Sequence, residues 1–154
     1  MKIFIKKFLT KKGFTLIEIL VVATIIALLA GGAAISYSQL NKQSRDAKRK
    51  ADLEQIRAAL EMYRSNNGIY PVNLSILTTP APQQPYLNPI PTDPKSPTYT
   101  YYYTPLPTGC NNSSIYCNDY ILAAHLETAS ITCQSLSNQC TSNCTYCLGP
   151  YGQK

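Results

Sequence analysis

The chain begins with a long run of apolar residues that follows a short basic segment. From Phe14 to Ile35 there are 22 residues, and Glu18 is the only charged side chain among them. About 20 apolar residues are enough for a helix to span a bilayer, so the run predicts a membrane-spanning helix. Because a carboxylate inside a membrane costs roughly 2.5–3.5 kcal/mol on insertion scales, Glu18 is predicted to have a function and a positively charged partner.

The pattern then changes to that of an amphipathic helix. Between Arg45 and Arg64 there is no Gly or Pro. Large apolar residues recur there at intervals of three, four and three, which places them on one helical face: Leu53, Ile56, Leu60 and Tyr63. Asn66-Asn67-Gly68 predicts the helix end. We therefore expect one helix from about Phe14 to about Asn66, whose second half packs on a globular head.

Charged residues fill the other face of this second half. The basic residues Arg45, Lys48, Arg49 and Lys50 are predicted to form its solvated or lipid-headgroup side, and pairing with acids of a neighbouring subunit, such as Asp52, is the alternative. Asp46 precedes Lys50 by four residues, a spacing that favours an ion pair along a helix.

The remainder of the chain predicts an antiparallel sheet after an extended loop. Ten of the 11 prolines lie from Pro71 to Pro107, a density that excludes a regular helix. Strands are expected at the tyrosine-rich run Tyr99–Tyr103, at Tyr120–Leu126 after the Cys110–Cys117 loop, and near Tyr146–Leu148. The predicted fold class is α+β, with a long N-terminal helix packed on a small antiparallel sheet.

All six cysteines lie in the C-terminal third, beyond the apolar run: Cys110, Cys117, Cys133, Cys140, Cys144 and Cys147. An even number of cysteines in a small exported domain is typical of disulfides that form outside the cytoplasm. Cys110 with Cys117 is the preferred pair, since it would close a loop between two strands. Cys133 is expected to pair with one of Cys140, Cys144 and Cys147. The spacing of the last three also occurs in iron–sulfur sites, but disulfides are the favoured interpretation.

The charge distribution indicates topology and not nucleic-acid binding. The formal net charge is +6, but five lysines precede Gly13, and the remaining nine basic residues face eight acids. The lysine-rich start predicts a cytoplasmic N-terminus. After Arg64 only Lys95 and Lys154 are basic, so the head has no basic patch for DNA. The lone histidine, His125, lies in an apolar run, and we predict no catalytic site, no metal and no cofactor.

The segment Lys12-Gly13-Phe14-Thr15-Leu16-Ile17-Glu18 resembles the type III signal sequence of type IV prepilins and pseudopilins. The resemblance implies that a prepilin peptidase cuts between Gly13 and Phe14 and methylates the new Phe14 amine. It also implies a homo-oligomeric filament in which Glu18 pairs with the Phe14 amine of a neighbouring subunit. A secretory signal peptide and a plain signal anchor are the simpler alternatives, and both leave Glu18 without a role.

Further residues extend this resemblance into the head. Asn67-Gly68-Ile69-Tyr70-Pro71, the Leu87–Pro94 segment and the tyrosine-rich strand are similar to the major pseudopilin of type II secretion and to minimal type IV pilins. That pseudopilin typically binds calcium through aspartates in a loop between its last strands. Here only Asp93 and Asp119 are available, and Cys110 and Cys117 bracket the equivalent loop. We expect a disulfide to stiffen the loop in place of calcium.

Four segments are therefore predicted: a leader (1–13), a membrane and filament-core half-helix (14–37), an amphipathic half-helix (38–66) and a head with a Cys-rich end (67–154). The first interpretation is a structural subunit of a type IV pilus-like filament, which lies in the cytoplasmic membrane before assembly and at the cell surface or in the periplasm afterwards. Its partners would be membrane lipid, the peptidase and an inner-membrane assembly platform. The alternatives are the major pseudopilin of a type II secretion system, a DNA-uptake pilin and a membrane-anchored ligand-binding module.

Overall fold

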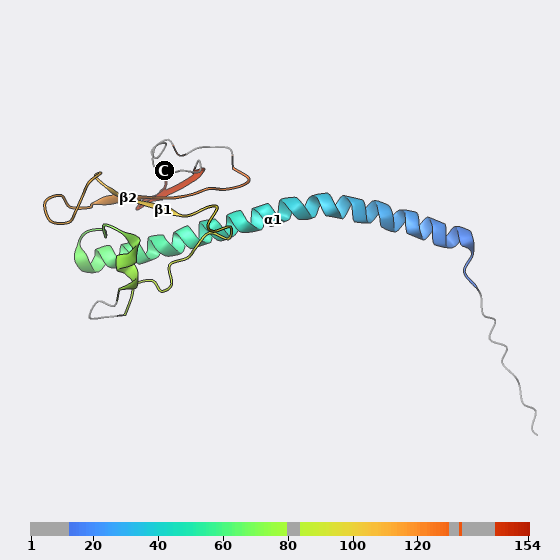
Figure 1. The fold of residues 1–154 in the computed structure, drawn as a ribbon, viewed down its shortest axis with the longest axis horizontal. Coiled ribbons are helices and arrows are strands. Elements are labelled where there is room, and N and C mark those ends of the chain that lie inside the picture. Colours follow the sequence, from blue (N-terminus) through green and yellow to red (C-terminus); the bar gives the residue numbers. More distant parts are fainter. Residues whose placement is uncertain (1–12, 80–83, 130–132, 134–143) are drawn as a thin grey trace, which may run out of the picture. The chain divides into compact units, whose positions relative to one another are not determined.

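The computed structural model describes residues 13–79, 84–129, 133 and 144–154. The chain divides into two compact units, Met1–Gln39 and Leu40–Lys154, and helix α1 (Leu16–Asn67) contributes to both. The second unit, which we call the head, continues with a short 3₁₀ helix, η1 (Leu74–Thr78), and four strands (Figure 1). These strands are β1 (Tyr102–Leu106), β2 (Asp119–Ala124), β3 (Tyr146–Gly149) and β4 (Gly152–Gln153).

Helix α1 has nearly the bounds that the apolar pattern predicts. It ends at Asn67, and Gly68 follows in a left-handed conformation with φ of 76°. The N–H of Gly68 donates to the carbonyl of Arg64 at 2.7 Å, which satisfies one of the last free carbonyls of the helix. Glycine adopts this backbone conformation without steric cost, so Asn66-Asn67-Gly68 stops the helix as expected.

The strands form one antiparallel sheet in the order β1-β2-β3-β4, which confirms the α+β fold. Tyr103 is opposite Leu122, and Leu122 is in turn opposite Leu148. The strand predicted at Tyr99–Tyr103 begins three residues later and continues through Pro105. Because β1 is an edge strand, the missing N–H of Pro105 leaves no ladder bond unmade inside the sheet. The short strand β4 and the helix η1 were not predicted.

The main core of the head lies between α1 and the sheet (Figure 1). Leu53, Ile56 and Leu60 are fully buried, and Tyr63 packs partly buried beside them, which confirms the predicted stripe. Alternate residues of β2 meet this stripe, since successive strand residues point to opposite faces. Tyr120, Leu122 and Ala124 are the β2 residues in this core.

The opposite face of β2 is buried as well. Ile121 and Ala123 pack with Cys144 and Cys147 in a second, smaller core. Partly buried Tyr102, Leu106 and Cys133 border it. Burial on both faces explains why β2 reads as a continuous apolar run and not as an alternating one.

Candidate functional site: the N-terminal segment and the buried ion cluster of the head

The three residues singled out for processing and assembly lie at the start of α1. Gly13 and Phe14 precede the helix, and Glu18 is in its first turn. The N–H of Glu18 lies 3.3 Å from Oγ1 of Thr15, so Thr15 acts as a helix cap. Thr15-Leu16-Ile17-Glu18 has the sequence of a capping box, in which an acidic residue lies three positions after the cap. The contact uses the backbone N–H of Glu18 and leaves its carboxylate available for the charge role inferred from the sequence.

The first part of α1 presents apolar side chains all around its circumference. Leu16 and Leu28 are 83% and 78% exposed, and Phe14, just before the helix, is 78% exposed. Isolated exposed leucines are ordinary, but a helix that is apolar on every side requires a cover of lipid or protein. By length and composition α1 can cross a membrane. Glu18 is exposed within this apolar surface, as the sequence indicates.

An ion cluster inside the head was missed by the sequence analysis. Arg49 is fully buried, and its guanidinium binds Asp93 through Nε–Oδ2 and Nη2–Oδ1 contacts of 2.7 and 3.1 Å. Its Nη1 also donates to Asp46 at 2.8 Å and to Glu127 at 3.0 Å. The prediction that Arg49 lies on the solvated side is therefore wrong. Asp46 pairs with Arg49, three residues away, and not with Lys50.

Two more bases and two backbone groups complete the ion cluster. Arg45 binds both carboxylate oxygens of Glu127 at 2.7 Å, and Nζ of Lys95 lies 2.9 Å from Oε2. The N–H groups of Glu127 and Thr128 donate to Asp46 at 2.9 and 2.8 Å. The cluster therefore joins α1 to the proline-rich loop and to the segment after β2. Only Lys95, whose side chain is 42% exposed, reaches well into solvent.

The electrostatics of the ion cluster follow from this geometry. Hydrogen bonds from Arg45 lower the pKa of Glu127 far below its ordinary value, although burial opposes the shift. Burial would raise the pKa of Asp46, but hydrogen bonds from Thr128, the Glu127 N–H and Arg49 outweigh it and lower the pKa. Burial also disfavours the charged form of Arg49, and its three carboxylate partners more than compensate, so its pKa is raised.

The lowered pKa values predict a head that loses stability in acid. A group whose pKa is depressed on folding stabilises the fold above its unfolded pKa, and this contribution disappears as the pH falls through the folded pKa. The ordinary values are 4.5 for Glu127 and 3.8 for Asp46, so the loss should begin near these values and continue below them. Glu127→Gln should lower the free energy of unfolding at neutral pH and flatten its acid dependence.

Urea unfolding at a series of pH values measures this effect. Glu54→Gln is the matched control, because Glu54 forms an exposed pair with Arg57 in which its side chain is 45% exposed. The control should keep the acid dependence of the unchanged protein. An unfolding free energy that falls equally with acid in Glu127→Gln would show that the ion cluster does not cause the dependence.

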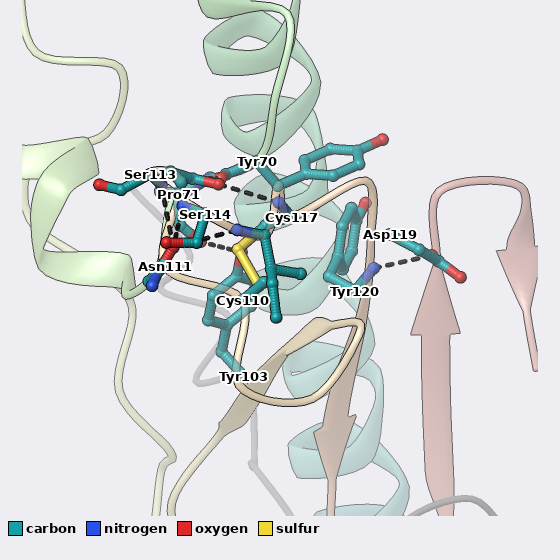
Figure 2. Close-up of a disulfide and its surroundings, with 12 residues drawn as sticks. Tyr70, Pro71, Tyr103, Cys110, Asn111, Ser113, Ser114, Cys117, Asp119 and Tyr120 are labelled. Atoms are coloured by element: carbon teal, nitrogen blue, oxygen red, sulfur yellow. Dashed lines mark hydrogen bonds between the residues drawn. A yellow bond between two sulfur atoms is a disulfide. The ribbon is translucent and has the colours of Figure 1, made fainter.

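A disulfide-closed loop connects β1 and β2. Cys110 is bonded to Cys117, the pair that the sequence analysis preferred (Figure 2). Oδ1 of Asn111 accepts hydrogen bonds from the N–H groups of Ser113 and Ser114 at 2.9 and 2.8 Å, which folds the loop on itself. The N–H of Tyr70 donates to the carbonyl of Cys117 at 2.9 Å. The loop is therefore fixed to the segment that follows α1.

Buried tyrosines pack beside this disulfide-closed loop. The rings of Tyr70 and Tyr120 meet edge to face with centroids 4.7 Å apart, and both hydroxyl groups lie 3.0 to 3.2 Å from Glu61. Burial and the Glu61 carboxylate raise the pKa of Tyr70 to about 12, so the hydroxyl stays protonated and donates. Tyr103, in the tyrosine-rich strand that the sequence predicts, also serves packing, and its hydroxyl donates to the Pro71 carbonyl at 2.6 Å (Figure 2).

The remaining cysteines also form disulfides where they are described. Cys133 is bonded to Cys147, one of its three expected partners. Cys144 is disulfide-bonded too, and Cys140 lies outside the described residues. Because these sulfur atoms pack in the second core, the disulfides fasten the C-terminal segment on the outer face of the sheet.

The aspartates considered for calcium have other partners. Asp93 is buried against Arg49, and Asp119 binds Nζ of Lys154 at 2.8 Å and the N–H of Tyr120 at 2.7 Å. Over residues 13–79, 84–129, 133 and 144–154, no group of three or more His, Cys, Asp or Glu side chains is placed to hold a metal ion.

The fold is that of a type IV pilin-like protein. It has a long N-terminal helix with an uncovered apolar segment, a Gly-Phe pair before this helix and a small antiparallel sheet after it in the chain. Comparison with known proteins supports this class. Residues 9–34 match the prokaryotic N-terminal methylation motif. Residues 37–115, or 79 of 154, match the family described as Type II secretion system (T2SS), protein G. The chain belongs to this family.

Curated relatives carry the same description, Type II secretion system core protein G. The Vibrio cholerae protein is 28% identical over 107 residues, which is 62% of this chain and 73% of the relative. The Klebsiella michiganensis protein is 31% identical over 98 residues, covering 55% and 68%. The Pseudomonas aeruginosa protein is 39% identical over 61 residues, covering 40% and 43%. No solved structure matches the chain significantly.

These matches favour the secretion pseudopilin, which the sequence analysis gave as an alternative, over the pilus subunit that it placed first. The family match ends at residue 115, before β2 begins at Asp119. The second core and the Cys133–Cys147 disulfide therefore belong to a part of the head outside the match.

Proposed function

We propose that this chain is a pseudopilin of a type II secretion system, a structural subunit that forms a short filament acting in protein export. The observation that carries the proposal is the combination, along one continuous helix, of an N-terminal methylation motif with a head of the protein G family. The uncovered apolar surface of residues 16–33 supports membrane anchoring before assembly. The chain is then a substrate of a peptidase and has no catalytic role of its own.

In this proposal each segment has one task. Residues 1–13 form a leader that is removed, and residues 14–37 anchor the subunit in the membrane and later fill the filament core. Residues 38–66 continue the helix from this core into the head, and residues 67–154 complete the head. Assembly proteins of the inner membrane would move the subunit from lipid into the filament. Glu18 would then meet the Phe14 amine of a neighbour, because a buried carboxylate requires a positive partner.

Replacement of Gly13 tests the assigned cleavage site. Gly13→Leu should leave an uncut chain in the membrane, since a bulky side chain at this position would keep the peptide bond after residue 13 from reaching the active site of the peptidase. Immunoblotting of membrane fractions separates the cut and uncut forms by size. Thr10→Ala, three residues earlier in the leader, is the control and should be processed normally. Efficient processing of Gly13→Leu would refute the site.

A deletion experiment tests the secretory function. Cells without this chain should retain exported proteins in the periplasm, and the unchanged chain should restore their release into the medium. Gly13→Leu should not restore it. If export is normal in the deletion strain but surface filaments disappear, the chain is a pilus subunit and the secretory proposal fails.

A further inference from the structure

The head has more positively charged side chains than it has carboxylates to pair with them. Every side-chain carboxylate in the described part of residues 40–154 contacts a base or a hydroxyl group within the head. Three belong to the ion cluster, two form pairs with Arg57 and Lys154, and two accept from tyrosine hydroxyl groups. These carboxylates are Asp46, Asp52, Glu54, Glu61, Asp93, Asp119 and Glu127.

Most bases of the head are also engaged. Arg45, Arg49, Arg57, Lys95 and Lys154 bind carboxylates, and Arg64 donates to the hydroxyl of Tyr70 at 2.9 Å. Within the described head, three lysines have no carboxylate partner: Lys42, Lys48 and Lys50. All three are exposed. Lys50 makes a cation–π contact, in which its Nζ lies 5.4 Å from the centre of the Tyr146 ring. We call these three residues the lysine collar.

The lysine collar follows the apolar segment directly along α1. Lys42 is five residues beyond Tyr37, which at about 1.5 Å per residue is about 7.5 Å along the helix. The polar layer of each bilayer leaflet is about 5–8 Å thick, so Lys42 would lie at the headgroup level if residues 14–37 span the hydrocarbon. Lys48 and Lys50 would follow about 16–20 Å beyond Tyr37. The lysine collar would therefore lie beside the membrane surface, where anionic lipid headgroups are available as partners.

We propose that the lysine collar binds an anionic phospholipid surface, with Lys42 at the headgroups and Lys48 and Lys50 attracted by the surface potential beyond them, and holds the unassembled subunit on the membrane. This inference rests on the membrane insertion contained in the proposed function and adds the lipid class. A neighbouring copy is the less suitable partner, because the carboxylates of its head are already engaged. A lysine close to an anionic surface should strengthen lipid binding by roughly fivefold. Because surface potential decays over about 8–10 Å at physiological salt, Lys42 should contribute most and Lys50 least.

Site-resolved acetylation of lysines tests the proposal on the full chain. The chain is reconstituted in vesicles of phosphatidylcholine alone and in vesicles that also contain phosphatidylglycerol, and labelling rates are read by peptide mass spectrometry. With phosphatidylglycerol, labelling of Lys42 should slow by roughly fivefold, with smaller effects at Lys48 and Lys50. Lys154 should not change. About 1 M salt, with a Debye length near 3 Å, should abolish most of the protection.

A charge-matched pair of variants isolates the collar from net charge. Lys42→Gln/Lys48→Gln/Lys50→Gln and Arg57→Gln/Arg64→Gln/Lys154→Gln both remove three positive charges. In native mass spectrometry with mixed lipids, only the first should lose its preference for phosphatidylglycerol, by at least tenfold. Equal preference in both variants would overturn the proposal.

The labelling results also separate the failures. Equal protection in both vesicle types would show depth of insertion without lipid selection and overturn this inference alone. Protection that appears only when the subunits are assembled would assign the collar to a neighbouring copy. A chain that carbonate extracts from the vesicles has not inserted, and that result would overturn the proposed function together with this inference.

Discussion

Glu18→Ala is expected to leave cleavage after Gly13 intact and to reduce filament assembly by at least tenfold. Breaking an ion pair in a low-dielectric core costs about 3–5 kcal/mol, because one charge is left buried without its partner. The processed subunit should therefore accumulate in the membrane. Quantitative immunoblotting of sheared filaments against membranes measures the ratio of assembled to unassembled subunit.

Glu18→Gln separates the two roles of this side chain. Glutamine keeps the capping-box pattern with Thr15 but removes the charge. If charge pairing drives assembly, Glu18→Gln should fail as Glu18→Ala does. Thr24→Ala, a change in the same apolar segment that removes only a hydroxyl bonded to the Val21 carbonyl at 2.8 Å, should assemble normally. Normal filament levels with Glu18→Gln would show that the charge of Glu18 is not needed and would refute its pairing role in assembly.

The second large effect is expected at the ion cluster of the head. Arg49→Met should lower the free energy of unfolding by about 3–5 kcal/mol, because Asp46 and Asp93 would stay buried without their cation. The change removes the contacts of Arg49 with Asp93, Asp46 and Glu127 at once. Urea unfolding followed by tyrosine fluorescence measures the loss.

Arg57→Met provides the matched control for this change. Arg57 is also an arginine on α1 with an acid three residues away, but its pair with Glu54 is partly exposed on both sides. Exposed pairs contribute about 0–1 kcal/mol, so the control should unfold almost as the unchanged protein does. If Arg49→Met is as stable as Arg57→Met, the ion cluster does not hold the head together.

Much of the fold follows from local patterns in the sequence. The period of three and four in Leu53, Ile56 and Leu60 predicts the helix and its buried face, and Asn66-Asn67-Gly68 predicts its end. The approximate strand positions follow from β-branched and aromatic residues. Strand β1 begins and ends three residues later than predicted, because its bounds are set by pairing with β2 and not by the Tyr/Thr composition. It continues through Pro105 because an edge strand tolerates proline.

The ion cluster could not be predicted in the same way. Arg49 meets Asp93, 44 residues later, and Glu127, 78 residues later, and a charged run on a helix normally faces solvent. The signal that could have revealed it is Asp93, the only acid between Glu61 and Asp119, because an acid in the proline-rich loop needs a base if it is buried. The N-terminal candidates differ again. Gly13, Phe14 and Glu18 form one contiguous motif, so they are found from the sequence without any tertiary contact.

We propose that this chain is a processed subunit of a secretion filament. Mass spectrometry of the N-terminus of protein from sheared filaments tests it most directly. A methylated Phe14 terminus is the predicted result, and it would establish cleavage after Gly13 and assembly together. An intact Met1 terminus, found only in membranes, would contradict the account and identify a chain that stays anchored by its leader and apolar helix.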